Sequence, residues 1–476
     1  MLMRIGGEEA GAASGDWLDV INPATGEVLD RVPAGGKEDV DAAVGAAERA
    51  FAGWSAKGPR ERGKVLFHAA EAIRAAHGDL ARTLTREQGK PLAEAVDEVR
   101  GCANVLEFYA SVSGCLSGDF IRLGPSGDGV VVHEPIGVCG AIIPWNMPVL
   151  LMAWKAGPAL LAGNTLVLKP SATTPLTDLA IAGILERSGL PAGVLNMVTG
   201  TGDAAGNAIV THPGIQKVSF TGNTATGLAV RKAAAPFLKE VTLELGGSDP
   251  MIVWKDAPLP AAVAGAVRGR FYNAGQVCNA VKRIYVHEEI APQFQAELLA
   301  RVRSLTVGNG LDPSVDMGPL QNRAQLERIE GQVDRLRDKE EGRLLAGGSR
   351  IRGPLHDRGF FFAPTLVTDV APDAAVLREE VFGPVLPVMA VPDLDTAIAE
   401  ANRSRYGLGA SVWTRDLGVA RAVFDRARAG VVWVNRHLTV PPEIPFGGVK
   451  ESGLGRENGV QAISQWTRTK SLFLGW

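Results

Sequence analysis

The sequence predicts an α/β protein with a Rossmann-like doubly wound cofactor domain, a second α/β catalytic domain and a small β arm. Between Gly137 and Gly247, apolar β-branched runs alternate with helical patterns, and the connections between them are short. Such alternation is typical of parallel strands joined by crossover helices. The length of 476 residues allows two or more domains, and 46% hydrophobic with 21% charged residues is ordinary for a globular protein.

Composition argues against several other classes of protein. A net charge of −3, without a dense run of Lys or Arg, does not favour nucleic acid as a partner. The longest apolar stretch, Pro148–Gly163, is interrupted by Lys155 and Pro158, so no membrane span is expected. The four scattered cysteines indicate a reducing compartment and no zinc site. With no signal peptide visible, we expect a cytoplasmic protein that binds no metal.

The first part of the chain is expected to support the sheet. Asp19–Val32 contains the turn residues of a hairpin, and Lys37–Trp54 and Arg60–Ser113 have a helical spacing of apolar residues. The segment Glu87–Pro91 interrupts the second helical stretch and is interpreted as scaffold. Ser117–Pro135 then changes to glycines and strand-like alternation, which fits either an arm or an ordinary edge hairpin.

The Rossmann-like core is predicted from the strict alternation that follows. The expected strands are Val138–Ile143, Thr165–Leu168, Val194–Val198, Lys217–Phe220 and Val241–Leu245. The expected helices are Val149–Ala162, Pro175–Ser188, Ala204–Thr211 and Thr226–Ala235. Sheets of this kind bind ligands at the carboxyl ends of their strands, so a dinucleotide is the leading candidate ligand.

A second domain is predicted to begin after Gly247. Its expected strands are Met251–Val253, Arg283–Val286, Val431–Asn435 and a strand that Phe360–Thr365 leads into. Its expected helices are Ala261–Phe271, Ala291–Leu305 and Gln321–Leu336. The tail Thr467–Trp476 alternates enough to form a closing strand.

Two residues, Cys278 and Glu244, lie at positions where a catalytic role would explain their presence. Cys278 lies in the polar turn Gly275–Asn279, directly before a strand, where a thiol can be exposed and nucleophilic. Glu244 interrupts the apolar strand Val241–Leu245, where burial raises the pKa of a carboxyl group towards neutrality and suits a general base. Taken alone, Cys278 is more simply explained as a small buried hydrophobic residue.

Two glycine-rich segments compete as a phosphate site. Gly200–Gly206 resembles G-x-G-x-x-G but is one residue too long, and it lacks an acidic partner at the expected distance. Phe220–Gly227 follows a clear strand and opens a helix, so its backbone N–H groups point at an anion site. A capped structural turn is the alternative for this second segment.

The segments Leu243–Gly247 (L-E-L-G-G) and Gly275–Cys278 (G-Q-V-C) resemble the general-base and nucleophile motifs of the aldehyde dehydrogenase superfamily. Their order and separation match the non-acylating, NAD(P)-dependent branch, and the resemblance covers nearly the whole chain. It implies that Cys278 is the nucleophile, that Glu244 is the base, and that Asn146 donates to the oxyanion. Lys155 matches a lysine that some members use in proton relay, although a plain helix lysine explains it equally well.

The resemblance also implies a site for NAD or NADP. Phe220–Gly227 would contact the pyrophosphate and Lys169 the adenosine ribose. Ala172 stands where NAD-preferring members commonly carry glutamate, so we expect NADP to be accepted. Glu380 would hold the nicotinamide ribose and Phe382 would pack on the nicotinamide, with a solvated acidic turn as the alternative. The expected cofactor-binding residues are Ile143, Pro144, Trp145, Lys169, Ser171, Ala172, Gly202, Gly206, Phe220, Thr221, Gly222, Asn223, Gly227, Leu245, Gly246, Glu380 and Phe382.

The domain boundaries and the assembly follow from the same resemblance. An NAD(P)-binding domain would comprise residues 1–116 and 137–246, and a catalytic domain residues 247–445. Residues 117–136 and 457–476 would form an oligomerisation arm and tail that pair with another subunit in a homodimer or homotetramer. Around Gln465 many members have a glutamate that helps to relay protons, and this chain departs from that pattern.

The predicted function is NAD(P)-dependent oxidation of an aldehyde to a carboxylic acid through a thiohemiacetal and a thioester of Cys278. A CoA-acylating dehydrogenase is one alternative, but those relatives generally lack the base that Glu244 supplies. A catalytically silent structural protein on the same scaffold is the alternative outside enzymes. The intact set of Cys278, Glu244 and Asn146 argues against it.

The substrate class is predicted from the residues before the nucleophile. Succinate-semialdehyde relatives often place an arginine where this chain has Tyr272, beside Phe271. This aromatic pair favours a neutral aliphatic, aryl or short hydroxyaldehyde as the small-molecule substrate. A succinate-semialdehyde-type activity is the alternative, because Arg270 and Arg283 flank the site in sequence and could fold inward.

Overall fold

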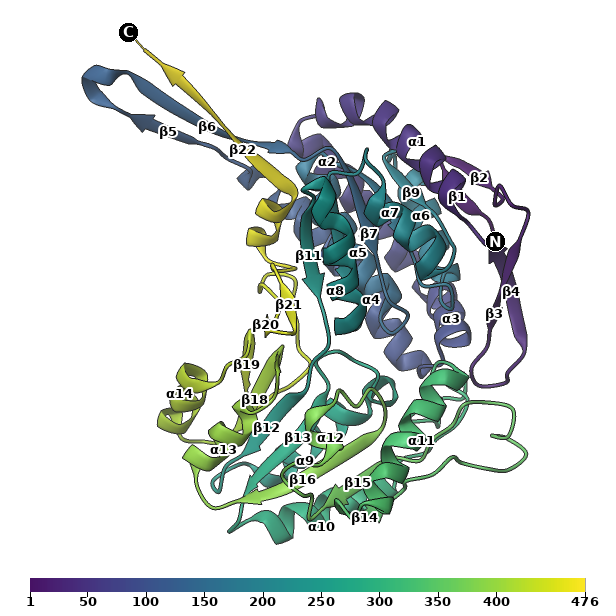
Figure 1. Cartoon of the computed structure of the whole chain (residues 1–476), viewed down its shortest axis with the longest axis vertical. Coiled ribbons are helices and arrows are strands. Elements are labelled where there is room, and N and C mark those ends of the chain that lie inside the picture. Colours follow the sequence, from purple (N-terminus) through teal and green to yellow (C-terminus); the bar gives the residue numbers. More distant parts are fainter. Residues whose placement is uncertain (476) are drawn as a thin grey trace.

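A computed structural model describes residues 1–475 and shows two α/β domains with a separate, protruding arm (Figure 1). The predicted fold class is therefore confirmed. Trp476, the last residue of the predicted tail strand, lies outside the described residues. Of the helices within residues 1–475, none combines the length and the apolar character needed to cross a membrane.

The first domain contains the predicted Rossmann-like sheet, with strand order β2-β1-β9-β8-β7-β10-β11-β21. The strands are β1 (Met3–Ile5), β2 (Glu8–Ala10), β7 (Val138–Ile142), β8 (Thr165–Lys169), β9 (Leu195–Met197), β10 (Lys217–Thr221), β11 (Glu240–Glu244) and β21 (Gly453–Leu454). The strands β7 to β11 are parallel to one another, as predicted, whereas the short strands β1, β2 and β21 pair antiparallel. The strand order reverses between β7 and β10, which places the expected ligand site at their carboxyl ends.

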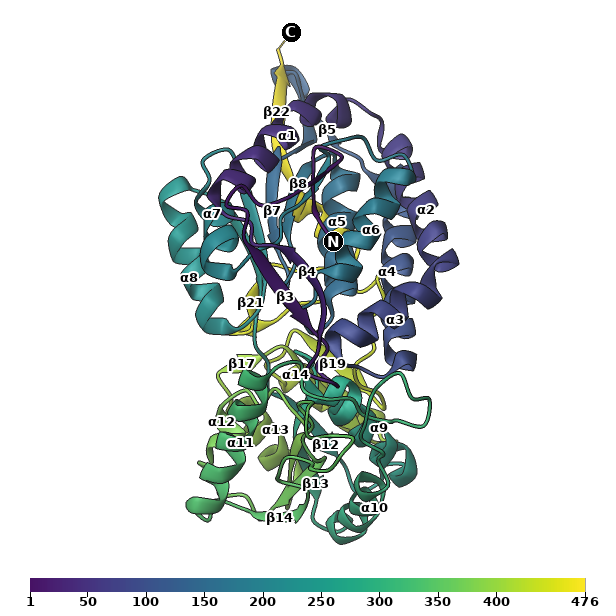
Figure 2. The same cartoon turned by 90° about the vertical axis from the view of Figure 1, so that its right-hand side faces the viewer.

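Helices cover both faces of this sheet (Figure 2). One face packs against α2 (Pro59–Ala75), α3 (His77–Gln88), α4 (Leu92–Ser111), α5 (Pro148–Ala162) and α6 (Leu176–Arg187). The other packs against α1 (Lys37–Ser55), α7 (Asn207–Thr211) and α8 (Thr224–Ala234). Because both faces are buried, the strands consist of nearly continuous apolar runs. The predicted break at Glu87–Pro91 separates α3 from α4, and the predicted hairpin forms as β3 (Trp17–Ile21) and β4 (Val28–Pro33).

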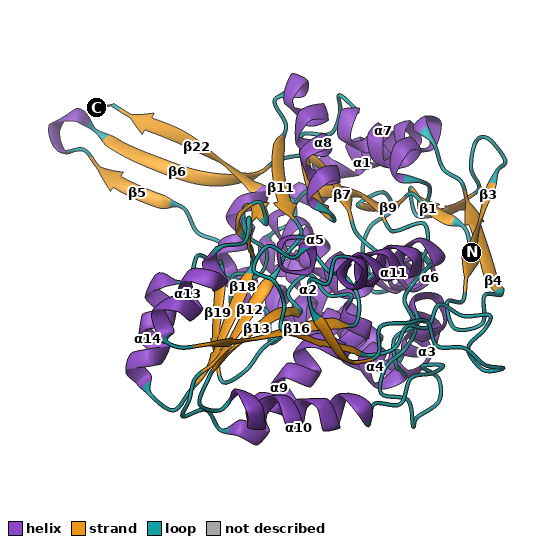
Figure 3. Cartoon of the chain, turned by 60° about the horizontal axis from the view of Figure 1, so that its bottom comes forward, coloured by secondary structure: helices purple, strands orange, loops and turns teal. Residues whose placement is uncertain are grey.

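The second domain has its own sheet, with strand order β14-β15-β16-β13-β12-β18-β19. The strands are β12 (Asp249–Val253), β13 (Val281–His287), β14 (Arg343–Ala346), β15 (Thr365–Thr368), β16 (Val385–Val391), β18 (Gly409–Trp413) and β19 (Val431–Val434). Figure 3 shows α9 (Leu259–Phe271) and α10 (Ala291–Arg303) below this sheet and α13 (Leu394–Asn402) and α14 (Leu417–Arg426) at its left. The helices α11 (Arg323–Asp338) and α12 (Ala375–Arg378) share one core cluster with α9 and α10, and α13 and α14 belong to another.

The arm is a three-stranded antiparallel sheet that projects away from both domains (Figure 1). It consists of β5 (Asp119–Arg122), β6 (Asp128–Pro135) and the tail strand β22 (Thr467–Leu474), with β6 in the middle. The segment that the sequence left open between an arm and an edge hairpin is therefore a hairpin extended by the tail of the same chain. Apolar side chains stay exposed on it, with Phe120 61% and Phe473 75% accessible.

Candidate active site

A cavity of about 340 Å³ lies at the carboxyl ends of β7, β8 and β10, and residues of the second domain form its other side. Cys278 and Asn146 both line it. Every predicted cofactor residue lines it as well, except Gly206 and Gly227. The fold thus brings the proposed nucleophile, the proposed oxyanion donor and the proposed cofactor residues to one cavity, from segments far apart in the chain.

The two glycines that do not line the cavity pack behind its wall. A Cβ atom on Gly227 would clash with the side chain of Leu245, so this glycine lets α8 approach the strand end that carries Leu245. A Cβ on Gly206 would meet the Lys169 side chain at 3.7 Å, an ordinary contact. Gly227 therefore shapes the wall indirectly, whereas Gly206 is not required there by packing.

The start of α8 forms one end of the cavity. The Asn223 side-chain oxygen caps this helix by accepting a hydrogen bond of 2.8 Å from the Thr226 N–H. Gly222, Asn223 and Thr226 all lie on the cavity wall. The end of a helix with free N–H groups, opening on a cavity, favours an anionic group such as a phosphate.

Lys169 supplies a cation at the end of β8. Its ammonium group donates to the carbonyl oxygen of Pro170 at 2.8 Å, and burial lowers its pKa to about 8. Ser171 and Ala172 follow it on the wall. Among the described residues that line this cavity, Glu380 is the only carboxylate, and it comes from the second domain. Among the described residues, the first domain therefore contributes no acidic side chain to the wall that holds Lys169.

Glu380 and Phe382 form the wall opposite the Rossmann-like sheet. One carboxylate oxygen of Glu380 accepts a 3.0 Å hydrogen bond from the Gly247 N–H. A Cβ on Gly246 would lie 2.7 Å from the other oxygen, so the Glu380 carboxylate packs closely against this glycine. The Phe382 ring packs edge-on against Trp145, with the ring centroids 5.5 Å apart.

The backbone before Cys278 is held in an unusual shape. Asn273 and Ala274 both adopt positive φ angles, 50° and 53°, which is uncommon for residues other than glycine. The Gln276 side chain donates to the Asn273 carbonyl oxygen at 3.0 Å and accepts from the Gln321 N–H at 2.9 Å. This buried amide thereby fixes the turn from which the partly buried Cys278 side chain reaches the cavity.

Burial dominates the electrostatics of the Cys278 thiol. It raises the pKa of this thiol to about 12, and the ammonium group of Lys282 acts in the opposite direction. The carboxyl groups of Glu244, Asp249 and Glu380 raise the pKa further. Because the thiolate is the reactive form, a nearby positive charge matters for reactivity at neutral pH.

Glu244 is 4% exposed, and neither of its carboxyl oxygens has a hydrogen-bond partner among the described residues. Burial raises its pKa well above the ordinary value, Glu457 raises it further, and Lys155 and Arg456 lower it. A Cβ on Gly447 would lie 2.8 Å from one of these oxygens, so the glycine-rich loop Pro445–Arg456, called the glycine loop below, packs directly against the carboxyl group. When deprotonated, such a group can accept a proton from a water molecule.

Lys155 is fully buried and has a carboxylate partner that the sequence did not indicate. Its ammonium group lies 2.8 Å from Glu457 and 2.9 Å from the Ser219 hydroxyl, which is itself 3.1 Å from Glu457. The chain has Gln465 where many relatives have a glutamate, and the carboxylate that contacts Lys155 is Glu457. An acidic residue directly after Arg456, at the end of the glycine loop, was the available signal.

The segment Glu87–Pro91, interpreted above as scaffold, also contacts the candidate site through Lys90. The buried Lys90 ammonium donates to the backbone carbonyl oxygen of Asn146 at 2.8 Å and pairs with the buried carboxylate of Glu98. The Asn273 side chain donates to the same carbonyl oxygen at 2.9 Å. Lys90 therefore fixes the segment that carries the predicted oxyanion donor.

The predicted substrate residues do not lie on the cavity wall. Phe271 is 3% exposed and belongs to the core of the second domain. The Tyr272 hydroxyl donates to the carbonyl oxygen of Glu94 at 3.4 Å. Sequence reasoning instead missed Gln325 and Arg328, which line the cavity from α11. Their helical pattern was visible in the sequence, but the packing of α11 beside the cavity was not.

The two arginines that flank the site in sequence are bound to backbone carbonyl groups. The Arg270 guanidinium donates to Val381 at 3.0 Å and to Gly383. The Arg283 guanidinium donates to Ser248 at 2.7 Å. Both side chains are buried, so neither is free to bind a charged substrate.

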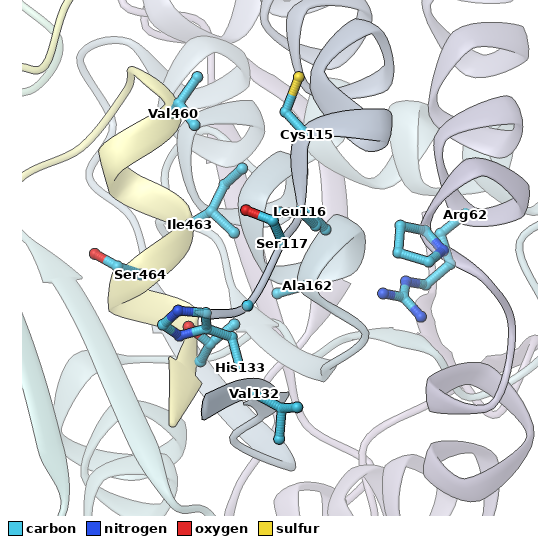
Figure 4. A pocket seen from close by; sticks show the side chains of 13 residues that line it. Arg62, Cys115, Leu116, Ser117, Val132, His133, Ala162, Val460, Ile463 and Ser464 are labelled. Carbon is cyan, nitrogen blue, oxygen red and sulfur yellow. The ribbon is translucent and has the colours of Figure 1, made fainter. Parts of the chain in front are cut away.

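A second cavity, of about 390 Å³, lies at the root of the arm. It contains the exposed thiol of Cys115 and the ring of His133, but Figure 4 shows the two groups at opposite ends of it. A thiol needs a base or cation beside it to become a nucleophile at neutral pH. The arrangement at the arm therefore lacks the pairing found around Cys278.

Comparison with known proteins agrees with this geometry. The protein-family model described as "Aldehyde dehydrogenase family" matches residues 10–472 of this chain. An NADP-dependent enzyme from E. coli is 39% identical over 100% of this chain and 98% of its own, with a TM-score of 0.97. A mutant aldehyde dehydrogenase from Bacillus cereus is 38% identical over 100% and 96%, with a TM-score of 0.97. Betaine aldehyde dehydrogenase from Staphylococcus aureus in complex with NAD⁺ is 36% identical over 100% and 95%, with a TM-score of 0.97.

Proposed function

The chain belongs to the aldehyde dehydrogenase family and is an NAD(P)-dependent oxidoreductase, and we propose that it oxidises a neutral aldehyde to the carboxylic acid through a covalent intermediate on Cys278. The observation that carries this proposal is the shared cavity. Cys278, Asn146 and all candidate dinucleotide residues except Gly206 and Gly227 line the same space. Glu244 directly precedes Leu245 on the cavity wall, and its carboxyl group is buried without a hydrogen-bond partner among the described residues.

In the proposed first half-reaction, the Cys278 thiolate adds to the aldehyde carbon and forms a thiohemiacetal. The oxyanion accepts hydrogen bonds from the Asn146 side chain and from the Cys278 backbone N–H. When bound, the nicotinamide ring of the cofactor supplies the chemistry of a hydride acceptor. The product of this half-reaction is a thioester on Cys278.

In the second half-reaction, Glu244 removes a proton from water. The hydroxyl oxygen adds to the thioester carbon, the carbon–sulfur bond breaks, and the carboxylic acid leaves while Cys278 is regenerated. Lys155, Ser219 and Glu457 form the hydrogen-bonded group that we propose to pass the proton of Glu244 away from the cavity. This base separates the proposed function from a CoA-acylating activity.

The chemistry of the cavity wall fits a dinucleotide. The capped start of α8 suits the pyrophosphate, Lys169 the adenosine ribose, and Glu380 the nicotinamide ribose, while Phe382 and Trp145 provide an aromatic surface. Similar structures include one in complex with NAD⁺ and one of an NADP-dependent enzyme. With Ala172 beside Lys169, we propose that this enzyme accepts NADP as well as NAD.

The preference for neutral aldehydes rests on the contacts of the nearby cations. Arg270 and Arg283 donate to backbone carbonyl groups, and Arg328 on the cavity wall donates to the carbonyl oxygen of Glu380 at 3.1 Å. Burying a second carboxylate without a free cation is unfavourable. A succinate-semialdehyde activity is therefore the weaker alternative.

The arm provides a surface for assembly. Its sheet projects beyond the body, both edge strands are open within the described chain, and Phe120 and Phe473 are exposed. Open strand edges with apolar side chains readily pair with another chain. We propose that the arm pairs with a second copy in a homodimer or homotetramer, which light scattering on the purified protein would test.

The experiment that tests the proposed function is an absorbance assay for reduced nicotinamide. The purified protein is mixed with NAD or NADP and a panel of aldehydes, and Cys278→Ala serves as the matched control. We expect reduced cofactor to form with neutral aldehydes only when Cys278 is present. A silent structural protein on this scaffold would give no signal with any aldehyde.

A further inference from the structure

Lys282 is a buried cation attached to the turn that carries Cys278. It lies on β13, four residues after the thiol, and is 1% exposed. Its ammonium group donates to the carbonyl oxygens of Val277 and Cys278, both at 2.9 Å. The side chain thus reaches back and closes the loop between the nucleophile and the strand.

The ammonium group also lies near Glu380 and Phe382, the two residues proposed to bind the nicotinamide end of the cofactor. It lies 3.9 Å from a carboxylate oxygen of Glu380 and 5.7 Å from the centre of the Phe382 ring. Burial lowers the pKa of Lys282, and the Glu380 carboxylate raises it. Two carbonyl acceptors and a carboxylate together favour the charged form of the side chain.

The other ionisable groups around the thiol act against its charge. Glu244 on β11, Asp249 on β12 and Glu380 before β16 are acidic, and each raises the pKa of Cys278. Arg270 on α9 also faces Lys282, but its guanidinium donates to the carbonyl groups of Val381 and Gly383. Lys282 is therefore the cation placed to favour a thiolate in this part of the described chain.

A second side chain, His437, also anchors the turn that carries Cys278. The His437 ring donates from Nε2 to the carbonyl oxygen of Asn279 at 2.7 Å, and its Nδ1 accepts from the Ser411 hydroxyl at 2.9 Å. A carbonyl oxygen can only accept, so Nε2 carries the proton in this arrangement. His437 anchors the residue after Cys278 independently of Lys282.

We propose that Lys282 is a positioning residue that fixes the Cys278 turn through its two carbonyl groups and favours the thiolate through its charge. This inference rests on the proposed role of Cys278 as the nucleophile. It adds a residue that touches neither substrate nor cofactor, yet sets the reactivity of the group that does.

The test is the pH dependence of thiol alkylation by iodoacetamide in full-length protein. Cys115 is the exposed cysteine besides the partly buried Cys278, so all variants carry Cys115→Ser. Lys282→Met removes the cation while keeping an apolar stem of similar length. Lys217→Met is the matched control, because Lys217 is equally buried but donates to Thr242 in the first sheet, at 2.8 Å.

Removing a positive charge beside a thiol raises the thiol pKa, so less thiolate is present at any pH below it. We expect Lys282→Met to be alkylated about tenfold more slowly there, the change that follows from a shift of about one pKa unit. The value of kcat/KM should fall with it. Lys217→Met should keep the parent pH profile.

An unchanged pH profile in Lys282→Met would overturn the inference. If this variant does not fold, Lys282→Gln replaces it, since glutamine retains a hydrogen-bond donor without charge and should give the same upward shift. Alkylation needs neither aldehyde nor cofactor. A shifted profile in a protein that oxidises no aldehyde would therefore reject the proposed function and leave the role of Lys282 standing.

Discussion

The Lys155 ammonium group lies 2.8 Å from a carboxylate oxygen of Glu457, although 302 positions separate the two residues in the chain. Both side chains are buried, and the Ser219 hydroxyl is hydrogen-bonded to each of them. The pair sits close enough to Glu244 to act on its pKa in opposite directions. Because Glu457 raises the pKa of Glu244 and Lys155 lowers it, substituting each residue in turn tests the surroundings of the proposed base.

The first prediction concerns the pH dependence of thioester hydrolysis. Burial raises the pKa of Glu244, Glu457 raises it further, and Lys155 lowers it. A base acts when deprotonated, so the rate rises with pH through this pKa. Glu457→Gln should move the rise to lower pH and Lys155→Met to higher pH, measured as the hydrolysis-limited rate across a pH series. Shifts in the same direction would contradict the assignment.

The second prediction concerns Lys90. Asn146→Ala removes a donor to the oxyanion and should lower kcat by about 10²–10³-fold. Lys90→Met should lower kcat less, because the Asn146 backbone loses one of its two anchors. In the Asn146→Ala background, Lys90→Met should change kcat little further. Full additivity in this double-mutant cycle would mean that Lys90 does not act through Asn146.

Lys90→Met also leaves Glu98 buried without its ion-pair partner, which costs about 3–5 kcal/mol of stability. Thermal unfolding of each variant therefore accompanies the kinetics, which are measured well below the unfolding transition. Changing both partners, in Lys90→Met with Glu98→Gln, should recover part of the stability but not the loss of kcat. Recovery of both would assign Lys90 a purely structural role.

The third prediction concerns the cofactor. Ala172 leaves the wall beside Lys169 without a carboxylate, so NADP should be used at a rate comparable to NAD. Ala172→Glu adds a fixed negative charge that repels a 2′-phosphate and can bind a ribose diol, so the ratio of kcat/KM values should move towards NAD. A parent enzyme that ignores saturating NADP would show that another group excludes the phosphate.

The fourth prediction concerns the substrate. The guanidinium groups of Arg270 and Arg283 are bound to carbonyl oxygens, so a second carboxylate on the substrate has no free partner there. Propanal, benzaldehyde and lactaldehyde, compared at one pH, should each give a higher kcat/KM than succinate semialdehyde. A clear advantage for the semialdehyde would direct attention to Arg328, and Arg328→Met would then show whether that cation binds it.

Local patterns carried most of what the sequence could predict. The alternation of apolar strands and helices fixed the Rossmann-like sheet, because such strands are buried on both faces. Motif residues such as Cys278, Asn146 and Glu380 were assigned by resemblance, and the structure brings them to one cavity. Each of these inferences used only residues that are close together in the chain or that belong to a motif.

Contacts between distant segments escaped sequence reasoning. Glu457 and Lys90 act on the site through pairs that only the folded chain creates. Phe271 is an aromatic residue of the kind that lines substrate pockets, but its side chain packs in the core of the second domain. The orientation of α9 decides which side of this helix is buried. The strands β16 and β18 were not predicted; Pro387 lies within β16, and proline argues against an internal strand.

The central claim is that Glu244 activates water to hydrolyse a thioester on Cys278, and the most direct test is the time course of cofactor reduction by Glu244→Gln. Glutamine keeps the shape of the side chain but cannot accept the proton. We predict a rapid burst of reduced cofactor, close to one equivalent per active site, followed by a slow steady rate. Cys278→Ala should show neither phase. Full steady turnover of Glu244→Gln without a burst would contradict the account.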